Sequence, residues 1–528
     1  MLMFITLMEL AFVLLWTIYL SRKCLKSCVW GGVICKIFVL TIMLPLAFIV
    51  GGQLSSLFNT GHYIEVLTLS NMDAYKDVGP KVLLSSTLII VICLLATVFC
   101  AFFPKKNLFG FIHWPLVLIC LAVCLANPHG AILNFGITYQ TYLKQRSFSP
   151  DAKMSGLQQE LYGQDSTFNN DFDAEKIMDL RNKSIVVIFA EGFSAEWIDR
   201  FNSYKDLTPN LDRFLSESVY FDNYYNHTAA TFRGLRGQLT SSYQYRGGYN
   251  VKNNGLGQVN AENIKKSLKG RLISVPQILK ANGYHSYFQS AHTMKYQLNL
   301  MLQTLDFDSV FGAEDVHGSG SDLTDQQIFA ALSGLINKDK LKKPYFLGAY
   351  TVGTHIGQNS SDVKYGDGNN VMLNTIRNFD DAFGKFWNSV NDRKDLVIIF
   401  TADHAAYPSD LYNDTFKTKR EFFIDKIPFA VWGDGIKPDV LDAHGRNSLD
   451  FAPTLLQSMG IRHAFNYFLG CSLFSSDCPR QFEYITAIGD DFVQTPELRL
   501  LKDNNSDDKR MIQKIRDFYN MSEDQHFL

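Results

Sequence analysis

The sequence LVIIFTADH at residues 396–404 is a continuous apolar run that ends in an acid and an imidazole, Asp403 and His404. A short run rich in β-branched residues is typical of a buried strand. A second run of this kind, SIVVIFAEG at residues 184–192, places Glu191 just after its end. Because such runs alternate with amphipathic segments from residue 184 onward, the sequence predicts an α/β domain with a mostly parallel central sheet flanked by helices.

Two more predicted strands end in histidines. The segment 285–288 runs on toward His292, and YFLGAY at 345–350 leads into Thr354 and His355. The carboxyl ends of parallel strands meet at one edge of a sheet, where ligand sites form. Each polar residue alone is better explained as a turn or cap residue than as a ligand. Their convergence is what predicts a metal and phosphate site.

The first 130 residues have a different character. Four apolar stretches, at roughly 2–20, 31–51, 83–103 and 108–127, each approach the ~20 residues that cross a bilayer as a helix. A cleaved signal peptide is the alternative for the first stretch. That stretch lacks a basic leader and three more apolar stretches follow it, which favours a membrane region of four helices.

Basic residues orient these helices. Arg22, Lys23 and Lys26 follow the first stretch, and Lys105 with Lys106 separates the third from the fourth. The positive-inside rule places both loops in the cytoplasm. The N-terminus and everything after residue 128 then lie on the outer side of the membrane.

Overall charge excludes one class of partner. The 528 residues contain 50 Lys and Arg against 52 Asp and Glu. The chain therefore lacks the basic excess that is typical of nucleic-acid-binding proteins.

The distribution of cysteines bears on the compartment of the large domain. Of nine, only Cys471 and Cys478 lie beyond residue 130. An isolated pair in an exported domain suggests a short-loop disulfide, and two unrelated buried thiols are the alternative.

The stretch with the clearest chemistry is NHTAATFRGLRGQLTS at residues 226–241. Thr231 lies where a loop of small residues gives way to a helical segment. A helix N-terminus favours developing negative charge on a hydroxyl, and a bound divalent metal lowers its pKa further. Thr231 is therefore a candidate nucleophile. A helix N-cap threonine is the alternative.

An ordered set of motifs resembles a known family. The set comprises FAE at 189–191, TPNLD at 208–212, the Thr231 segment, Thr354–His355 and ADH at 402–404. It resembles the sulfatase-like fold of the alkaline phosphatase superfamily over about residues 184–502. The similarity is greatest to membrane enzymes of the lipoteichoic acid synthase type and to phosphoglycerol and phosphoethanolamine transferases. The stretches ANGY (281–284), LDFD (305–308), IPF (427–429) and DFAPTLL (450–456) support it.

The resemblance assigns roles to residues. It implies that Glu191, Thr231, Asp403 and His404 bind a catalytic divalent metal, Mn²⁺ or Zn²⁺, and that Thr231 is also the nucleophile. His355 corresponds to the family's histidine in the substrate pocket. Carboxylates, an imidazole and an alkoxide are suitable ligands for either metal.

Further basic residues are candidate contacts to the substrate. His292 and Lys295 are expected to contact the donor head group. Arg233, with Arg236 nearby, is expected to hold a phosphate, since guanidinium groups match phosphate oxygens. A solvated helix face explains these arginines equally well.

Two departures from related families narrow the function. True sulfatases need a Cys or Ser that is oxidised to formylglycine, within a signature that includes an Arg. The stretch 231–235 has neither the convertible residue nor the Arg in register, which disfavours sulfate-ester hydrolysis. Phosphoethanolamine transferases usually carry Gly-Glu-Thr at the first ligand and a cysteine-rich loop. The stretch 190–192 reads Ala-Glu-Gly, which favours the phosphoglycerol type.

The expected organisation has four parts: 1–130 transmembrane, 131–180 juxtamembrane connector, 181–502 catalytic domain and 503–528 helical tail. The expected activity is transfer of a phospho-substituent from a membrane phospholipid to a cell-envelope glycan or lipid, through phosphothreonine. Hydrolysis, by a phosphodiesterase, phosphatase or sulfatase-type enzyme, is one alternative, and an inactive lipid-binding regulator is another. The expected location is a bacterial inner membrane, with the catalytic domain on the periplasmic or extracellular side.

Overall fold

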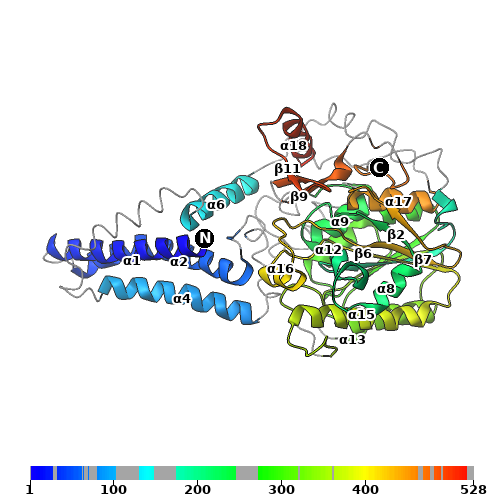
Figure 1. Ribbon diagram of the computed structural model, residues 1–528, viewed down its shortest axis with the longest axis horizontal. Helices are drawn as coiled ribbons and strands as arrows, with labels where there is room; N and C mark the ends of the chain where they lie inside the picture. Colours follow the sequence, from blue (N-terminus) through cyan, green and yellow to red (C-terminus); the bar gives the residue numbers. More distant parts are fainter. Residues whose placement is uncertain are drawn as a thin grey trace. The chain divides into compact units, whose positions relative to one another are not determined.

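The computed structural model describes residues 2–27, 32–61, 63–64, 69, 80–102, 130–147, 174–244, 272–318, 321–358, 362–461, 468–475, 478, 481–488 and 491–519. The chain divides into two compact units, Met1–Ser147 and Phe148–Leu528. The first is coloured blue to cyan in Figure 1.

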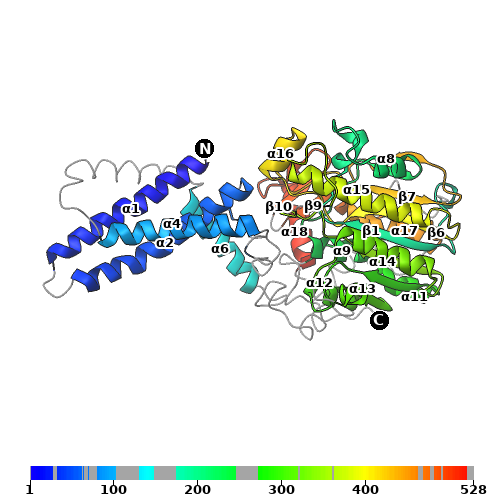
Figure 2. The ribbon, with the colours of Figure 1, turned by 90° about the horizontal axis from the view of Figure 1, so that it is seen from below.

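The N-terminal unit consists of long apolar helices. Its helices are α1 (Leu2–Ser27), α2 (Gly32–Thr60), α4 (Pro80–Phe102) and α6 (Ala131–Ser147). The first three pack along one another (Figure 2). Each is long and apolar enough to cross a membrane, over Leu2–Arg22, Val33–Asn59 and Lys81–Phe102. The fourth predicted stretch, 108–127, lies outside the described residues.

Polar side chains fix the start of α6 within this unit. The Glu9 carboxylate of α1 accepts a hydrogen bond of 3.1 Å from the Ile132 amide. The Gln53 side chain of α2 donates to the Asn134 side chain at 3.2 Å. Both Glu9 and Gln53 are buried. Helix N-terminal amides lack partners within their own helix, so Glu9 satisfies one that the apolar surroundings would otherwise leave unpaired.

The second unit is built on an eight-stranded sheet in the order β4-β3-β5-β1-β6-β7-β2-β8. The strands are β1 (Ser184–Ala190), β2 (Val219–Asp222), β3 (His285–Gln289), β4 (Ser309–Phe311), β5 (Tyr345–Tyr350), β6 (Leu396–Ala402), β7 (Phe429–Gly433) and β8 (Asp439–Asp442). Only β7 is antiparallel to its two neighbours. The prediction of a mostly parallel sheet is confirmed.

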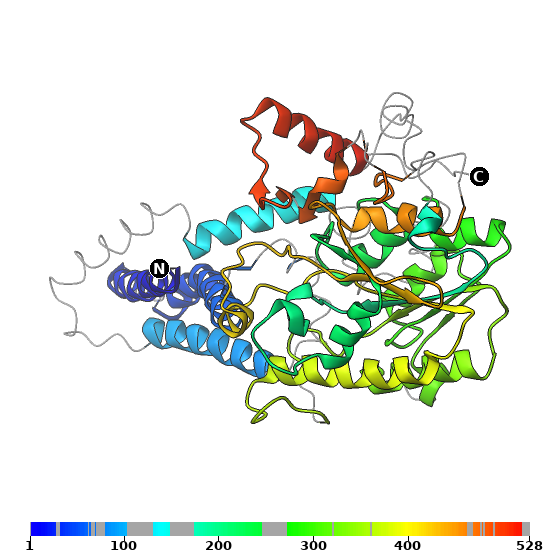
Figure 3. The same cartoon turned by 45° about the vertical axis from the view of Figure 1, so that its right-hand side comes forward.

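Helices cover both faces of this sheet. On one face lie α8 (Pro209–Ser216), α14 (Asp325–Asn337) and α15 (Val371–Val390), which contact one another. On the other lie α9 (Thr231–Thr240), α11 (Val275–Ala281) and α17 (Phe451–Ser458). Figure 3 shows α15 along one face and α17 along the other. Shorter helices, α12 (Gln297–Leu302), α13 (Glu314–His317) and α16 (Asp410–Phe416), lie in the connections.

Strand register sets the position of the site. The central strand β1 is buried along its whole length and pairs in parallel with β5 and β6. Its last residue, Ala190, lies opposite Ala402, the last residue of β6. A shift of one residue in either strand would turn every side chain to the other face. The register therefore places the residues that follow β1 beside those that follow β6.

A small C-terminal module extends the domain. Strands β9 (Ile485–Ile488), β10 (Asp491–Gln494) and β11 (Arg499–Leu500) form an antiparallel sheet, and α18 (Ser506–Tyr519) follows (Figure 1). Ile512 and Ile515 of α18 join a separate apolar cluster with Tyr243 and Phe482. A boundary at residue 502, as expected from the sequence, therefore falls inside this module.

Strand β9 also pairs with the loop that precedes α9. The Ala487 amide donates to the His227 carbonyl at 2.9 Å. The Thr228 hydroxyl donates to the Ala487 carbonyl, also at 2.9 Å. The C-terminal module thus holds the segment that leads into Thr231.

The structure contains a disulfide between Cys471 and Cys478, whose Cα atoms lie 5.9 Å apart. Beside it, the buried Arg446 guanidinium donates to the Cys471 carbonyl at 2.9 Å and pairs with the Asp450 carboxylate at 2.6 Å. The bridge and this ion pair together fix the loop after α17.

Removing this bridge is expected to destabilise the domain. Replacing Cys471 and Cys478 together by Ala should lower the free energy of unfolding by ~2–3 kcal/mol, because closure of this short loop restricts the unfolded chain. Urea unfolding of the purified protein measures the change. Reductant should lower the free energy of unfolding of the wild type more than that of the variant. Equal stability of both proteins without reductant would contradict the prediction.

Candidate metal and nucleophile site

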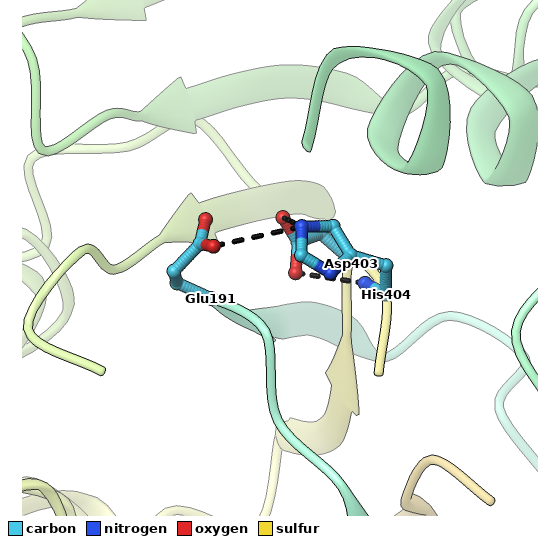
Figure 4. Close-up of side chains that lie close together, drawn as sticks. All are labelled: Glu191, Asp403 and His404. Atoms are coloured by element: carbon cyan, nitrogen blue, oxygen red, sulfur yellow. Dashed lines mark hydrogen bonds and ion pairs between the residues drawn. The ribbon is translucent and has the colours of Figure 1, made fainter. Parts of the chain in front are cut away.

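Three buried side chains converge just beyond β1 and β6. Glu191 follows β1, and Asp403 and His404 follow β6; their ligand atoms all lie within 4.8 Å of one another. His404 Nε2 is 3.5 Å from Glu191 Oε1 and 3.3 Å from Asp403 Oδ2. Figure 4 shows the three groups pointing toward a common centre. Two of the four predicted strand ends, those of β1 and β6, therefore meet here.

The two oxygens of Asp403 have different environments. Oδ1 accepts hydrogen bonds of 2.8 Å from the amides of Gly192 and His404. Oδ2 is buried and has no hydrogen-bond partner among the described residues. A buried carboxylate oxygen without a partner is costly unless a ligand takes that place. The hydrogen bonds to Oδ1 thus orient the Asp403 carboxylate, and Oδ2 remains available to bind a cation.

The tautomer of His404 follows from its surroundings. Its Nδ1 lies 2.8 Å from the Ala405 carbonyl, which only accepts, so Nδ1 donates and Nε2 keeps its lone pair. Nε2 is the atom that faces Glu191 and Asp403. Burial lowers the pKa of His404, although the negative charge of Glu191 opposes the shift. The neutral, metal-binding form of the ring is favoured.

The two carboxylates have opposite pKa shifts. Burial, together with the charge of Glu191, raises the pKa of Asp403 well above its ordinary value. Burial also acts to raise the pKa of Glu191, but the neighbouring His404 and His355, together with the hydrogen bonds from Tyr350 and Thr231, leave that pKa lowered. Two buried carboxylates this close cannot both ionise at low cost without a cation.

These donors fit a divalent metal. Glu191 and Asp403 supply carboxylate oxygens and His404 an imidazole nitrogen, a set that suits Zn²⁺ or Mn²⁺. The partnerless Asp403 Oδ2 is the specific observation in favour of this fit. Glu191, Asp403 and His404, with the Thr231 hydroxyl beside them, are the residues that would hold the ion.

Thr231 is the first residue of α9. Its hydroxyl donates to Glu191 Oε2 at 2.9 Å instead of capping the helix, so the N-cap alternative is wrong. The preceding residue, Ala230, has a φ of 72°, which is rare for a residue with a Cβ. Unfavourable backbone of this kind persists where the surroundings enforce it, often at functional sites. Here it directs Thr231 toward Glu191.

Helix α9 lies directly against the end of β6. A Cβ on Gly234 would lie 2.1 Å from the Asp403 carbonyl oxygen, so only glycine permits this approach. The Gln238 side chain donates to the Ala402 carbonyl at 2.9 Å. A Cβ on Gly237 would collide with the His227 ring. The glycine spacing within 226–241 was the available sequence signal for this packing.

Three residues hold Glu191, and the sequence assigned none of them this role, although Thr354 belongs to one of the quoted motifs. The Tyr350 hydroxyl donates to Glu191 Oε2, the oxygen that Thr231 also contacts. The Thr354 hydroxyl donates to the Glu191 carbonyl at 2.5 Å, and the Glu191 amide donates to the Thr351 hydroxyl at 3.3 Å. Tyr350 is the last residue of β5 and reads as ordinary core in the sequence.

Both predicted substrate histidines lie near these groups. His355 is partly buried, with Nδ1 2.9 Å from the Ile356 carbonyl, and its charge acts on the pKa values of Glu191 and His404. The buried His292 ring lies 5.7 Å from the Tyr350 ring and its Nδ1 is 3.0 Å from Asp322. His292 is thus linked to Glu191 through Tyr350.

The predicted arginine and lysine differ in exposure. Arg233 and Arg236 are buried, so the solvated-face alternative is wrong. Arg233 donates from Nε to the Ala229 carbonyl at 2.9 Å, and its charge acts on the pKa of His404. Lys295 is exposed on the surface. Its contact with a substrate stays a prediction.

Asp325 supports the turn that carries His355. This first residue of α14 is buried, and its Oδ1 accepts a hydrogen bond of 3.0 Å from the Gly353 amide. Burial raises the pKa of Asp325 to about 6 from an ordinary 3.8. The folded state therefore binds this proton more tightly than the unfolded state. Ionised Asp325 destabilises the fold above about pH 6, and this effect vanishes below pH 3.8.

Asp325→Asn is expected to stabilise the protein at neutral pH. Asparagine keeps an oxygen for the Gly353 amide and carries no charge, so the free energy of unfolding should rise by up to ~3 kcal/mol at pH 7.5. The advantage should be absent near pH 3.8. Urea unfolding of both proteins at the two pH values measures the difference. A variant that is less stable than the wild type by the same amount at both values would show that charge burial is not the cause.

A nearly parallel sheet with acidic and imidazole side chains at its carboxyl edge, facing a threonine at a helix N-terminus, combines candidate metal ligands with a candidate nucleophile. The sulfatase family model matches residues 183–461, more than half of the chain, and the chain belongs to the sulfatase family. The resemblance inferred from the ordered motifs is confirmed.

Solved structures agree on the fold. A protein in the alkaline phosphatase superfamily from Vibrio parahaemolyticus is 17% identical with a TM-score of 0.51, over 72% of this chain and 95% of that one. The lipoteichoic acid synthase LtaP from Listeria monocytogenes is 15% identical with a TM-score of 0.53, over 68% of this chain and 95% of LtaP. A comparison with curated proteins finds no match.

Proposed function

We propose that this chain transfers a phospho-substituent, phosphoglycerol or phosphoethanolamine, from a membrane phospholipid to a cell-envelope glycan or lipid. One observation carries the proposal. The Thr231 hydroxyl lies at the N-terminus of α9, 2.9 Å from one of three clustered metal-ligand candidates. A hydroxyl in such a place gains nucleophilicity from the helix N-terminus and from a neighbouring cation.

In the first step Thr231 Oγ attacks the phosphorus of the lipid. The new bond joins Thr231 to phosphorus, and the bond to the diacylglycerol oxygen breaks. The hydroxyl proton passes to Glu191 Oε2, which it already contacts, and is balanced by the proton that the departing oxygen takes up to give diacylglycerol. Glu191 loses its proton again before the second step. In the second step an acceptor hydroxyl attacks the same phosphorus, and Thr231 leaves as its hydroxyl again.

Residues around Thr231 have supporting roles. Glu191, Asp403 and His404 would hold a divalent metal, which would polarise a phosphoryl oxygen and lower the pKa of the threonine hydroxyl. Tyr350 orients Glu191 by its hydrogen bond. His355, His292 and Arg233 are proposed to bind the donor's phosphate and head group, with Lys295 at the outer end.

The lipid donor is supported by the N-terminal unit. Three helices there have the length and apolarity of membrane spans, which keeps the enzyme at its substrate. We propose that the protein lies in a bacterial inner membrane, and the distribution of basic residues favours a catalytic domain on the periplasmic or extracellular side. Cleavage of a lipid in the outer leaflet then needs no flipping step.

The test uses the full-length protein in detergent with Mn²⁺ or Zn²⁺. Phosphatidylglycerol and phosphatidylethanolamine, each labelled in the head group, are incubated with and without a glycan acceptor. Diacylglycerol release, label on Thr231 by mass spectrometry and label on the acceptor support transfer. Release of free head-group phosphate despite acceptor indicates the hydrolase alternative. No diacylglycerol from either lipid contradicts the proposed function and favours a regulator.

A further inference from the structure

One short segment contacts every stretch of chain that carries a ligand candidate. It comprises residues 420–426, between α16 and β7, and is called the brace below. Its partners are the turn after β1, the turn after β6 and the loop before α9. None of its residues belongs to the predicted site.

Arg420 joins the two strand-end turns. Its Nη2 donates to the Ala406 carbonyl at 2.8 Å, in the turn after β6. Its Nη1 lies 3.4 Å from the Ser194 hydroxyl, in the turn after β1. That hydroxyl in turn accepts a hydrogen bond of 3.1 Å from the Ala406 amide. One guanidinium and one hydroxyl therefore connect the turn of Glu191 to the turn of Asp403 and His404.

The Arg420 guanidinium also contacts Asp425 and Tyr412, which restrict its position. It lies 3.2 Å from the Asp425 carboxylate and 4.6 Å from the centre of the Tyr412 ring. The Tyr412 hydroxyl donates to the same Asp425 carboxylate at 3.2 Å. The Arg420 side chain is only 9% exposed. Its rotamer is thus fixed, and the turns it contacts are fixed with it.

The rest of the brace contacts His404 and the nucleophile loop. The Phe423 ring packs edge-on against the His404 ring, with centroids 5.1 Å apart. The Asn226 side chain donates to the Phe423 carbonyl at 3.0 Å and to the Thr228 carbonyl at 2.8 Å. The Asp425 amide donates back to the Asn226 side chain at 3.0 Å.

We propose that Arg420 is a positioning residue that sets the distance between the Glu191 turn and the Asp403–His404 turn, and thereby the affinity for the divalent cation. The inference rests on the metal-dependent function proposed above. Beyond Ala190 and Ala402, the backbone contributes one further bond, from the Asp403 amide to the Ala190 carbonyl at 3.2 Å, and the Gly192 amide donates to Asp403 Oδ1. Arg420 and Ser194 connect the two turns farther out. The planar fork of arginine bonds several fixed acceptors at once, which the single ammonium of lysine does not.

The experiment compares Arg420→Ala and Arg420→Lys with a matched control, Arg393→Ala. Arg393 lies before β6, at the opposite end of the strand, and pairs with the carboxylates of Asp339 at 3.1 Å and Asp395 at 3.2 Å. Titration calorimetry of the metal-free, full-length protein gives the Mn²⁺ dissociation constant. Melting in chelator reports folding.

Both Arg420 variants are expected to bind Mn²⁺ about 10–100-fold more weakly, the range for residues that orient metal ligands. Arg393→Ala should bind as the wild type does, even if its melting temperature falls equally. Arg420→Lys with wild-type affinity would show that charge alone suffices and would overturn the positioning role. So would Arg420→Ala with wild-type affinity.

Ser194→Ala tests the same inference in case Arg420→Ala does not fold. Ser194→Ala removes only the hydroxyl that links the two turns, and about 10-fold weaker binding is expected. Unchanged affinity in this variant would overturn the inference. A wild type that binds neither Mn²⁺ nor Zn²⁺ overturns the proposed function as well. A wild type that binds metal beside an equally competent Arg420 variant overturns only the role of the brace.

Discussion

Thr231→Ala is expected to abolish turnover while leaving the fold intact. The change removes the proposed nucleophile and one candidate ligand, and loss of covalent catalysis should lower the rate by orders of magnitude. The lost hydrogen bond to Glu191 should cost stability only about 1 kcal/mol. Diacylglycerol release from labelled lipid measures turnover, and thermal melting in detergent measures stability.

Thr228→Ala is the matched control, since it lies three residues earlier in the same loop. Its hydroxyl donates to the Ala487 carbonyl and so holds β9 instead of facing Glu191. This variant should retain the phosphothreonine at residue 231 and most of the turnover. Loss of activity in Thr228→Ala with full activity in Thr231→Ala would move the nucleophile. Full activity in both would remove the covalent mechanism.

Asp403→Asn is expected to weaken metal binding without lowering the stability of the metal-free protein. Asparagine keeps an oxygen for the amides of Gly192 and His404 but loses the charge that attracts a cation. Metal affinity should fall by at least about 100-fold, beyond the usual effect of residues that merely orient ligands, and turnover should fall with it. In chelator, the variant should melt no lower than the wild type, because burial disfavours the Asp403 charge.

Asp380→Asn is the control for the effect of removing a buried carboxylate charge. Asp380 is buried between α8 and α15, where it accepts the Leu211 amide at 2.8 Å, and burial raises its pKa to about 6. This variant should leave Mn²⁺ affinity unchanged. Titration calorimetry of both variants gives the comparison. If Asp403→Asn binds Mn²⁺ as tightly as Asp380→Asn does, Asp403 is not a ligand.

The sequence was informative where a local pattern decides the outcome. The apolar runs before Glu191 and Asp403 read as buried strands, and parallel pairing then brings both acids to one edge. Thr231 was identifiable because a loop of small residues precedes a helical pattern. In each case neighbouring residues alone carry the signal.

The rest depends on partners far away in the chain. Nothing in the run 429–433 indicates that β7 is antiparallel to its neighbours, since buried strands read alike in both directions. Tyr350 looks like core until Glu191 is placed beside it. The role proposed for Arg420 depends on its contact with Ser194, which lies more than 200 positions earlier in the sequence. Such pairings follow from tertiary packing, which local propensity does not encode.

The pairing of β9 with the loop before α9 also bears on the order in which the protein is made. Synthesis proceeds from the N-terminus, so His227 and Thr228 are made long before their partner in β9, Ala487. Until residue 487 has been made, the loop that leads into Thr231 lacks the strand that holds it. A chain truncated before β9 therefore contains Thr231 and all three acidic and imidazole side chains of the site, but not the strand that holds the loop before α9.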